Sequence, residues 1–388
     1  MPLALAEAGL LGSFTTGFYN SGSMARLASA LIPSTRRKLA QRYCSGIPNA
    51  LVNPQWRIEI LQKASTFFGD KTNRSWQWAD RAISEAVARI ARKEHSDLLL
   101  HEPYAWEAFN AEYAHCPRKV LFHFHLHPVF ERNLLGQDSE MYPLRTGKWL
   151  QFDARPEFDA RTVDLWRHAD LILCASTFTK RSLVSQGMPS DRCRVVPYGI
   201  DVAAGAITAE PPSAFSVLFV GSGIQRKGLH HLLEAWKKAS LPRNSTLTLV
   251  CRFLDPVLES MLASAPPSVK VLRGVSAAEL KNLFKTSALF VMPSLLEGFG
   301  QVFLESLSYG CPVLGTENSC LPDLGCEEDG VFLAKTGDPE NLRDKLENLH
   351  KAVTGEDSIP LRIRSFALAE KFSLQASRKN LVSALQAV

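Results

Sequence analysis

Two glutamates beside a glycine-rich turn have the residue types and the spacing of a ligand site. Glu297 opens the run Glu297-Gly-Phe-Gly300, and Glu305 follows with seven residues between the two glutamates. Glycines let the backbone approach a ligand closely, and the first N–H groups of a helix have no partners within it. Two carboxylates beside such donors suit a polyhydroxylated ligand, because each can accept from a different hydroxyl group. The simpler alternative is one carboxylate near a helix dipole and another on a solvated face.

A second run, Gly221-Ser-Gly-Ile-Gln-Arg-Lys-Gly228, combines glycines with a basic pair. The strand-like segment Ser216–Val220 precedes it, and a predicted helix follows from Leu229. A glycine turn between a strand and a helix can bind a diphosphate through its N–H groups, and the basic pair adds positive charge. The dinucleotide-binding pattern G-x-G-x-x-G is a weaker match, because the third glycine comes too late. The residues predicted to bind phosphates are Gly221, Gly223, Arg226 and Lys227.

Apolar runs predict the elements that must position these residues. Ala288–Met292 has the length and composition of a buried strand, and Pro293 ends it. A short helix is predicted from Gln301 to Tyr309, with Gly310 as its stop signal. In the second half of the chain, further strands are predicted at 216–220, 246–250, 269–272, 313–314 and 331–334, and helices at 256–263, at 277–286, from Pro339 and over 361–388 with a break at Phe372-Ser373. Such alternation predicts an α/β fold with a parallel sheet and helices on both faces.

The first half of the chain has a similar but weaker alternation. Helices are predicted at 2–9 and 55–94, and strands at 11–19, 97–100, 119–125 and 170–174. His101 opens the run His101-Glu-Pro103 directly after one of these strands. Open α/β sheets bind ligands beyond the carboxyl ends of their strands, so His101 is a candidate site residue. A histidine that is hydrogen-bonded within a loop is the alternative.

Three further histidines alternate along a predicted strand. His123, His125 and His127 would then lie on one face, where three imidazoles can bind zinc. No fourth ligand is spaced nearby, so polarity in a cleft or packing is the preferred interpretation. We therefore predict no metal site and no cofactor.

Composition narrows the class of protein. A chain of 388 residues with 46% hydrophobic residues suits two globular domains. The formal net charge of +5 favours phosphates or an anionic surface, but no dense basic stripe or recognisable module indicates nucleic-acid binding. No run of eighteen apolar residues is present, and the start, Met1–Glu7, is a poor signal peptide. The eight cysteines form no C-x-x-C pair, which favours reduced thiols in a cytosolic protein.

A basic amphipathic segment at 23–43 carries Arg36, Arg37, Lys38 and Arg42 around Leu31, Leu39 and Tyr43. A solvated helix face is the preferred interpretation, and a patch that contacts an anionic membrane surface is the alternative. Residues 202–214 are small, contain proline and lack periodicity, so they are predicted to be a linker.

These motifs together resemble the retaining glycosyltransferases of family 4. The spacing E-G-F-G-x-x-x-x-E is similar to the paired glutamates of that family, as are the H-E-P run at His101 and the runs A-S-x-F-T from Ala175 and P-Y-G-I-D from Pro197. The resemblance implies a GT-B architecture, in which two Rossmann-like domains with parallel sheets face each other across a cleft. It also implies an acceptor-side domain at 1–203, a nucleotide-sugar-binding domain at 214–360 and C-terminal helices at 361–388 that cross back to the first domain.

The resemblance implies a role for each matching residue. Glu297 and its loop contact the donor sugar, Glu305 holds the ribose, and His101 lies beside the reacting sugar carbon. Lys227, with Arg226, stabilises the charge on the leaving diphosphate. The expected catalytic residues are His101, Glu297 and Lys227, and the expected donor-binding residues are Gly221, Gly223, Arg226, Lys227, Glu297, Gly298, Phe299, Gly300 and Glu305.

The chain departs from the family pattern at two places. Family members usually open with a strand and a glycine-containing loop, which this sequence lacks, so we expect an upstream segment that encodes them. They also carry an arginine just after the first glycine of the phosphate run, where this chain has Ser222. Arg226 is expected to supply the missing charge.

The expected function is transfer of a sugar from a nucleotide sugar to an acceptor hydroxyl with retention, in polysaccharide or glycolipid biosynthesis. The acceptor would be a glycan or a lipid-linked sugar, and the protein would be cytoplasmic or peripheral on the inner face of the plasma membrane. A nucleotide-sugar epimerase of the same fold and a non-catalytic nucleotide-sugar binder are the alternatives.

Overall fold

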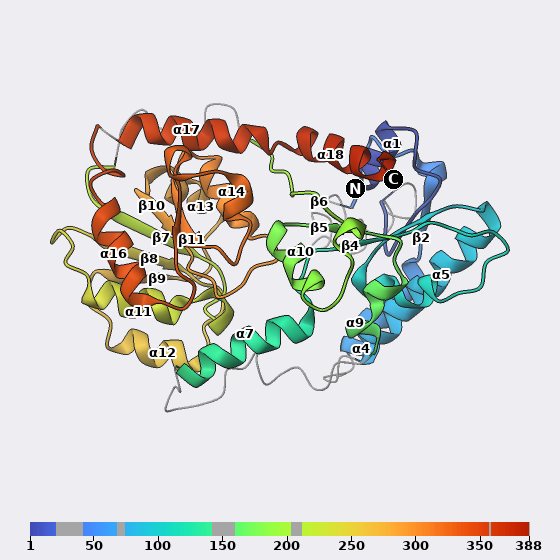
Figure 1. Cartoon of the computed structure of the whole chain (residues 1–388), viewed down its shortest axis with the longest axis horizontal. Coiled ribbons are helices and arrows are strands. Elements are labelled where there is room, and N and C mark those ends of the chain that lie inside the picture. Colours follow the sequence, from blue (N-terminus) through green and yellow to red (C-terminus); the bar gives the residue numbers. More distant parts are fainter. Residues whose placement is uncertain (21–41, 68–73, 142–159, 203–211, 357, 388) are drawn as a thin grey trace. The chain divides into compact units, whose positions relative to one another are not determined.

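The computed structural model describes residues 1–20, 42–67, 74–141, 160–202, 212–356 and 358–387 (Figure 1). Within these residues the chain is an α/β structure that divides into two compact units. The first unit comprises Met1–His123, Ala160–Leu173 and Arg378–Val388, and the second comprises Phe124–Asp159 and Cys174–Ser377. Most of the basic segment at 23–43 and of the linker at 202–214 lies outside the described residues.

A six-stranded parallel sheet forms the centre of the second unit, in the order β12–β11–β10–β7–β8–β9. Its middle strands consist of apolar, mostly β-branched or aromatic residues that are buried on both faces, as parallel sheets require. The six strands are β7 (Ser216–Val220), β8 (Thr246–Val250), β9 (Val269–Leu272), β10 (Leu289–Val291), β11 (Val313–Thr316) and β12 (Val331–Ala334).

Helices cover both faces of this sheet (Figure 1). Crossover connections between parallel strands are right-handed. The connections from β7 to β8 and from β8 to β9 therefore put α11 and α12 on one face. The connections from β9 to β10 and from β10 to β11 run in the opposite direction along the sheet, which puts α13 and α14 on the other face. In agreement, α11 contacts α12. Helix α16 also packs against α11, and α17 packs against α14. The helices of this part are α11 (Leu229–Lys238), α12 (Pro256–Ala263), α13 (Ala277–Thr286), α14 (Gln301–Leu307), α15 (Leu321–Leu324), α16 (Pro339–Leu349) and α17 (Ser358–Lys371).

The strand order reverses between β7 and β10. The chain leaves β7 toward β8 and β9 and then returns to pair β10 with the other side of β7. Open α/β sheets bind ligands in the crevice outside the carboxyl ends of the strands at such a switch point. The two loops that start there are the glycine-rich run after β7 and the Glu297 loop after β10.

A second parallel sheet has four strands in the order β3–β4–β5–β6. These strands are β3 (Leu98–His101), β4 (Lys119–His123), β5 (Leu171–Cys174) and β6 (Cys193–Val195), and a separate parallel pair joins β1 (Phe14–Thr16) to β2 (Val52–Pro54). The remaining helices are α1 (Pro2–Glu7), α4 (Trp56–Phe67), α5 (Arg74–Glu94), α6 (Trp106–Phe109), α7 (Pro128–Met141), α9 (Ala160–Val163), α10 (Thr177–Val184) and α18 (Leu374–Gln386).

Both ends of the chain belong to the first unit (Figure 1). Arg378 of α18 pairs there with Glu7 of α1 at 3.2 Å. None of the described helices combines the length and the apolar composition needed to cross a bilayer.

The predicted α/β class and the parallel sheets are confirmed, and most predicted elements of the second unit occur with the expected bounds. Some expected elements differ in extent from those observed. The strand expected at 119–125 ends at His123, the strand expected at 11–19 is only Phe14–Thr16, and the helix expected at 301–309 ends at Leu307.

Candidate functional site

The loops after β7 and β10 pack directly against each other. Leu295 donates its backbone N–H to Arg226 O at 2.9 Å. Gly228 has φ +64°, and a Cβ atom built on it would lie 1.9 Å from Pro293 O. Only glycine satisfies both the left-handed backbone and this close approach, so Gly228 fixes the contact between the two loops.

Glu297 is the centre of the site. Its Oε1 atom contacts Arg226 Nη1 at 2.8 Å and Lys227 Nζ at 2.5 Å. Both cations come from the short 3-10 helix at Gln225–Lys227, and Glu297 itself is only 6% exposed. The fold therefore brings together three of the residues that the sequence predicted for the site.

The charged side chains of Arg226, Lys227 and Glu297 are largely shielded from solvent. Burial by itself raises the pKa of Glu297, but the charges of Arg226 and Lys227 and their hydrogen bonds outweigh it and lower the pKa. Burial lowers the pKa of Lys227, with the Arg226 charge acting in the same direction and Glu297 opposing both. The carboxylate of Glu297 is thus ionised and is the counter-ion of two cations.

Glu305 lies on α14 and is half-buried. Burial raises the pKa of its carboxyl group. Within the described parts of the chain, no hydrogen bond or ion pair to this carboxylate is found, so it can accept hydrogen bonds from a ligand.

The glycines of the Glu297 loop are held by close contacts. Gly300 precedes α14 with φ +87°. A Cβ atom on Gly298 would lie 1.9 Å from Phe124 O, so this position also requires glycine. Phe299 is buried and packs edge-on against Tyr198, with 5.1 Å between ring centroids, so its side chain belongs to the core.

The sequence did not indicate the residues outside the Glu297 loop that form hydrogen bonds with its backbone. Ser176 Oγ and Thr179 Oγ1 both donate to Gly298 O, at 2.5 and 2.8 Å. Asn318 O accepts from Glu297 N at 2.8 Å, and Asn318 Nδ2 donates to Leu295 O at 3.0 Å. Asn318 follows β11, the neighbour of β10, so the rule that ligand sites lie at carboxyl ends of strands is the one signal that could have found it.

His101 lies in the other unit, at the end of β3 as expected. It packs edge-on against Phe122, with 5.2 Å between ring centroids, and burial is the main reason that its pKa is lowered. The expected alignment of three histidines on a strand face was wrong, because β4 ends at His123. His123 Nδ1 lies 2.6 Å from Glu102 Oε1, while His127 Nδ1 accepts from Val129 N at the start of α7.

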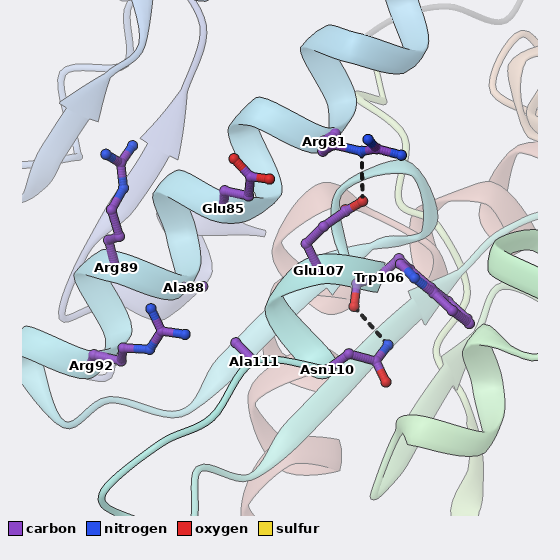
Figure 2. Close-up of a pocket in the computed structure, with 9 residues that line it drawn as sticks. All are labelled: Arg81, Glu85, Ala88, Arg89, Arg92, Trp106, Glu107, Asn110 and Ala111. Carbon is purple, nitrogen blue, oxygen red and sulfur yellow. Dashed lines mark hydrogen bonds and ion pairs between the residues drawn. The ribbon is translucent and has the colours of Figure 1, made fainter.

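A surface groove of about 630 Å³ lies over α5 and α6 of the first unit (Figure 2). Glu107 points toward Arg81, Asn110 donates to Trp106 O, and Arg89 and Arg92 lie on the other side of the groove. None of the residues predicted for the site lines this groove. Its lining residues are Arg81, Glu85, Ala88, Arg89, Arg92, Trp106, Glu107, Asn110 and Ala111.

Two family models match the chain in tandem. Residues 43–204 match Glycosyltransferase Family 4, and residues 214–352 match Glycosyl transferases group 1.

Among curated relatives, the putative colanic acid biosynthesis glycosyltransferase WcaL of Salmonella typhimurium is 24% identical over 248 residues, which cover 58% of this chain and 58% of that protein. The MMP alpha-(1->4)-mannosyltransferase of Mycolicibacterium hassiacum is 25% identical over 178 residues, which cover 45% and 43%. The chain spans about half the length of the curated relatives that it matches.

Solved structures share the fold over nearly the whole chain. Anabaena HepE in complex with UDP-glucose superposes with a TM-score of 0.60 at 16% identity, covering 97% of this chain and 99% of that one. The lipopolysaccharide outer core galactosyltransferase WaaB superposes with a TM-score of 0.56 at 13% identity, covering 96% and 98%. With the two parallel sheets, these matches establish the GT-B fold. The chain belongs to the group 1, family 4 glycosyltransferases.

Proposed function

We propose that the chain transfers a sugar from a nucleotide-sugar donor to an acceptor hydroxyl, with retention at the anomeric carbon. One observation carries this proposal: Arg226 and Lys227 converge on Glu297 where the strand order of the parallel sheet reverses. Two cations beside an ionised carboxylate suit a ligand that has a diphosphate at one end and sugar hydroxyl groups at the other.

The chemistry that this arrangement supports is stabilisation of a leaving group. As the glycosidic bond breaks, negative charge grows on the β-phosphate of the departing nucleoside diphosphate. Lys227 and Arg226 are already desolvated and held by Glu297, so they need little reorganisation when that charge develops. Glu297 in turn accepts hydrogen bonds from the sugar hydroxyl groups.

The other predicted residues take the roles that the family resemblance gives them. Glu305 holds the ribose, which suits a half-buried carboxylate without a protein partner among the described residues. The backbone of Gly298, Phe299 and Gly300 contacts the donor sugar, and Gly221 and Gly223 contact the diphosphate. His101 lies on the acceptor side, beside the reacting carbon. In this assignment residues 1–203 bind the acceptor, 214–360 bind the donor, and 361–388 are the C-terminal helices that return to the first domain.

The relatives suggest the class of donor and acceptor. HepE was solved with UDP-glucose, and the curated relatives include a colanic acid biosynthesis enzyme and a mannosyltransferase. We therefore propose a nucleotide hexose as donor and a glycan or a lipid-linked sugar as acceptor, in polysaccharide or glycolipid biosynthesis.

The first unit has a surface suited to a membrane-bound acceptor. Trp56, Ile60 and Leu61 of α4 and Trp76 and Trp78 of α5 are all exposed, the last four by 44–58% of their surface. Exposed tryptophans beside aliphatic side chains are typical of surfaces that contact the lipid headgroup region. These side chains support peripheral contact with a membrane surface, and we propose the cytoplasmic side and anionic lipid; co-sedimentation with anionic and zwitterionic vesicles tests the contact and its lipid preference.

The decisive experiment has two stages. A panel of nucleoside diphosphate hexoses is first screened for an increase in melting temperature, because a ligand that binds only the folded state stabilises it. The donor that stabilises the protein most is then incubated with glycan and lipid-linked acceptors, and the anomeric configuration of the product is read by NMR. Retained configuration supports the proposal. Donor binding without transfer or hydrolysis identifies the non-catalytic binder, and conversion of the donor to an epimer identifies the epimerase.

A further inference from the structure

Asp138, His230 and His231 form a buried cluster that the proposed transfer reaction does not use. His231 Nε2 lies 2.7 Å from Asp138 Oδ1, and His230 Nε2 lies 3.2 Å from Asp138 Oδ2. The ligand-type atoms of the three residues all lie within 4.8 Å of one another. Each of the three side chains is only 2% exposed.

Two helices that are distant in sequence supply these residues. Asp138 lies near the end of α7, and the two histidines lie in the first turn of α11. Consecutive residues of a helix point about 100° apart, yet both imidazole rings turn Nε2 toward one carboxylate, with 3.9 Å between ring centroids. Packing thus orients two good nitrogen ligands and one oxygen ligand toward a common point.

The distances are close to those of a metal site. Zinc–nitrogen and zinc–oxygen bonds of about 2.0–2.2 Å at tetrahedral angles separate the ligand atoms by about 3.3 Å. The separations between the imidazole nitrogens and the carboxylate oxygens are 2.7–3.3 Å, and the ligand atoms of all three residues lie within 4.8 Å of one another. Adjustments of these three side chains would therefore admit an ion. Imidazole with a carboxylate oxygen is a donor set that suits zinc and neighbouring first-row ions, whereas magnesium and calcium prefer oxygen alone.

Gln225 supports the carboxylate in the orientation that binding requires. Its Nε2 lies 2.7 Å from Asp138 Oδ2, 2.8 Å from Ser139 Oγ and 3.0 Å from Leu135 O, so three acceptors share its two N–H groups. Carboxylates that bind metals are usually held in this way by a hydrogen bond to the second oxygen. Ser139 is partly exposed, so solvent lies close enough to supply a fourth ligand.

We propose that Asp138, His230 and His231 bind one zinc-class divalent cation, with water in the fourth position. The ion links α7 to the start of α11 and stabilises the second unit. This site is separate from the proposed transfer reaction, in which the ion takes no part.

Metal uptake by the full chain tests the proposal directly. The protein is stripped with a chelator, shown by circular dichroism to remain folded, and titrated with Co²⁺ and Zn²⁺. We expect one ion per chain, the visible absorption of four-coordinate Co²⁺ with nitrogen and oxygen ligands, and an increase in melting temperature with Zn²⁺ that Mg²⁺ does not produce. Folded, unsubstituted protein that binds no Co²⁺ or Zn²⁺ overturns the proposal, whatever the variants do.

Variants then locate the ion. Asp138→Asn and His231→Gln should weaken Zn²⁺ binding by about 100-fold or more, since even the loss of a residue that only supports a ligand costs 10- to 100-fold. His95→Asn, at an exposed histidine with φ +50° that asparagine tolerates, is the matched control and should bind as the unsubstituted protein does. Unchanged Zn²⁺ affinity in both ligand variants places the ion elsewhere and overturns the assignment.

Discussion

Arg226 Nη1 and Glu297 Oε1 lie 2.8 Å apart, although 71 positions separate the two residues in the chain. Lys227 contacts the same oxygen. One carboxylate therefore balances two cations of the neighbouring loop, and a change on either side disturbs both loops.

Removing the lysine should slow the chemical step. Lys227→Ala is expected to lower turnover by about 100- to 1,000-fold, with a smaller loss of donor affinity, because an interaction that strengthens as charge develops acts mainly on the transition state. Steady-state kinetics measure this effect. Lys237→Ala, at an exposed position of α11, is the control and should be near normal. Near-normal turnover in Lys227→Ala would mean that the diphosphate binds elsewhere.

A second kinetic series asks whether Arg226 replaces the arginine that family members carry at the position of Ser222. In that case Arg226→Ala should reduce turnover about as much as Lys227→Ala does. Adding Ser222→Arg to Arg226→Ala should then recover part of the rate. No recovery, with both variants folded, would contradict the substitution of one arginine for the other.

Substitutions of Glu305 and Glu297 should have different effects on the affinity for the nucleoside diphosphate. Glu305→Ala is expected to weaken binding of the nucleoside diphosphate by about 1.5–3 kcal/mol, since that is the typical contribution of a hydrogen bond to a charged group. Glu297→Ala should spare this affinity and reduce turnover instead. Calorimetry with Glu328→Ala, an exposed glutamate of the same unit, as control measures both. Unchanged nucleotide affinity in Glu305→Ala would refute the ribose assignment.

The half-buried carboxyl group of Glu305 should affect how the stability of the protein depends on pH. Burial raises its pKa in the folded state above the ordinary value of 4.5, so between these two values the folded state binds more protons than the unfolded state. The free energy of unfolding therefore falls as pH rises through this window. Glu305→Gln removes this loss and should be more stable than the unsubstituted protein at neutral pH, with the difference vanishing below pH 4.5. Urea denaturation across this range measures it, and a pH-independent difference would count against the mechanism.

Gly228 and Gly274 both have left-handed backbone angles, but only Gly228 lies against a neighbouring loop. Alanine substitutions at the two positions therefore distinguish the cost of backbone strain from the cost of a steric clash. Gly228 and Gly274 have φ values of +64° and +71°, but a Cβ atom at Gly274 would meet nothing within 4 Å. Gly274→Ala should cost about 1–2 kcal/mol, the cost of a left-handed residue with a side chain. Gly228→Ala should cost clearly more and also lower turnover, because the added methyl group displaces Pro293 and with it the Glu297 loop. Equal losses of stability in the two variants would show that the loop contact contributes nothing.

The hydroxyl groups of Ser176 and Thr179 both donate to Gly298 O, so their contributions to the free energy of unfolding should not be additive. Thr179→Val alone leaves Ser176 as a donor to Gly298 O and should have a small effect. Combining it with Ser176→Ala removes both donors and should cost about 1–3 kcal/mol beyond the sum of the single effects, the price of a buried carbonyl without a partner. Denaturant unfolding of the four proteins of this cycle gives the coupling, and strict additivity would contradict it.

The sequence by itself determined the elements of the second unit and the local motifs of the site. The strand Val331–Ala334 is a short apolar run, and Thr246–Val250 alternates buried leucines with half-buried residues. Helix α13 begins at Ala277, and Ser276 before it forms a capping box with Glu279. The Glu297 loop and the basic pair were recognisable because glycines, carboxylates and cations at short spacing have a direct chemical meaning. Signals of this kind depend only on residues that are neighbours along the chain.

Tertiary structure alone decided which distant residues meet. Arg226 and Lys227 reach Glu297 because β10 returns to pair with β7 after β8 and β9 have extended the sheet on the other side. Asp138 meets His230 across 92 positions, through the packing of two helices that no local pattern relates. The end of β4 at His123 likewise depends on where the neighbouring strand stops offering hydrogen-bond partners. Such contacts follow from strand order and helix packing, which act between segments, whereas periodicity and turn chemistry act within them.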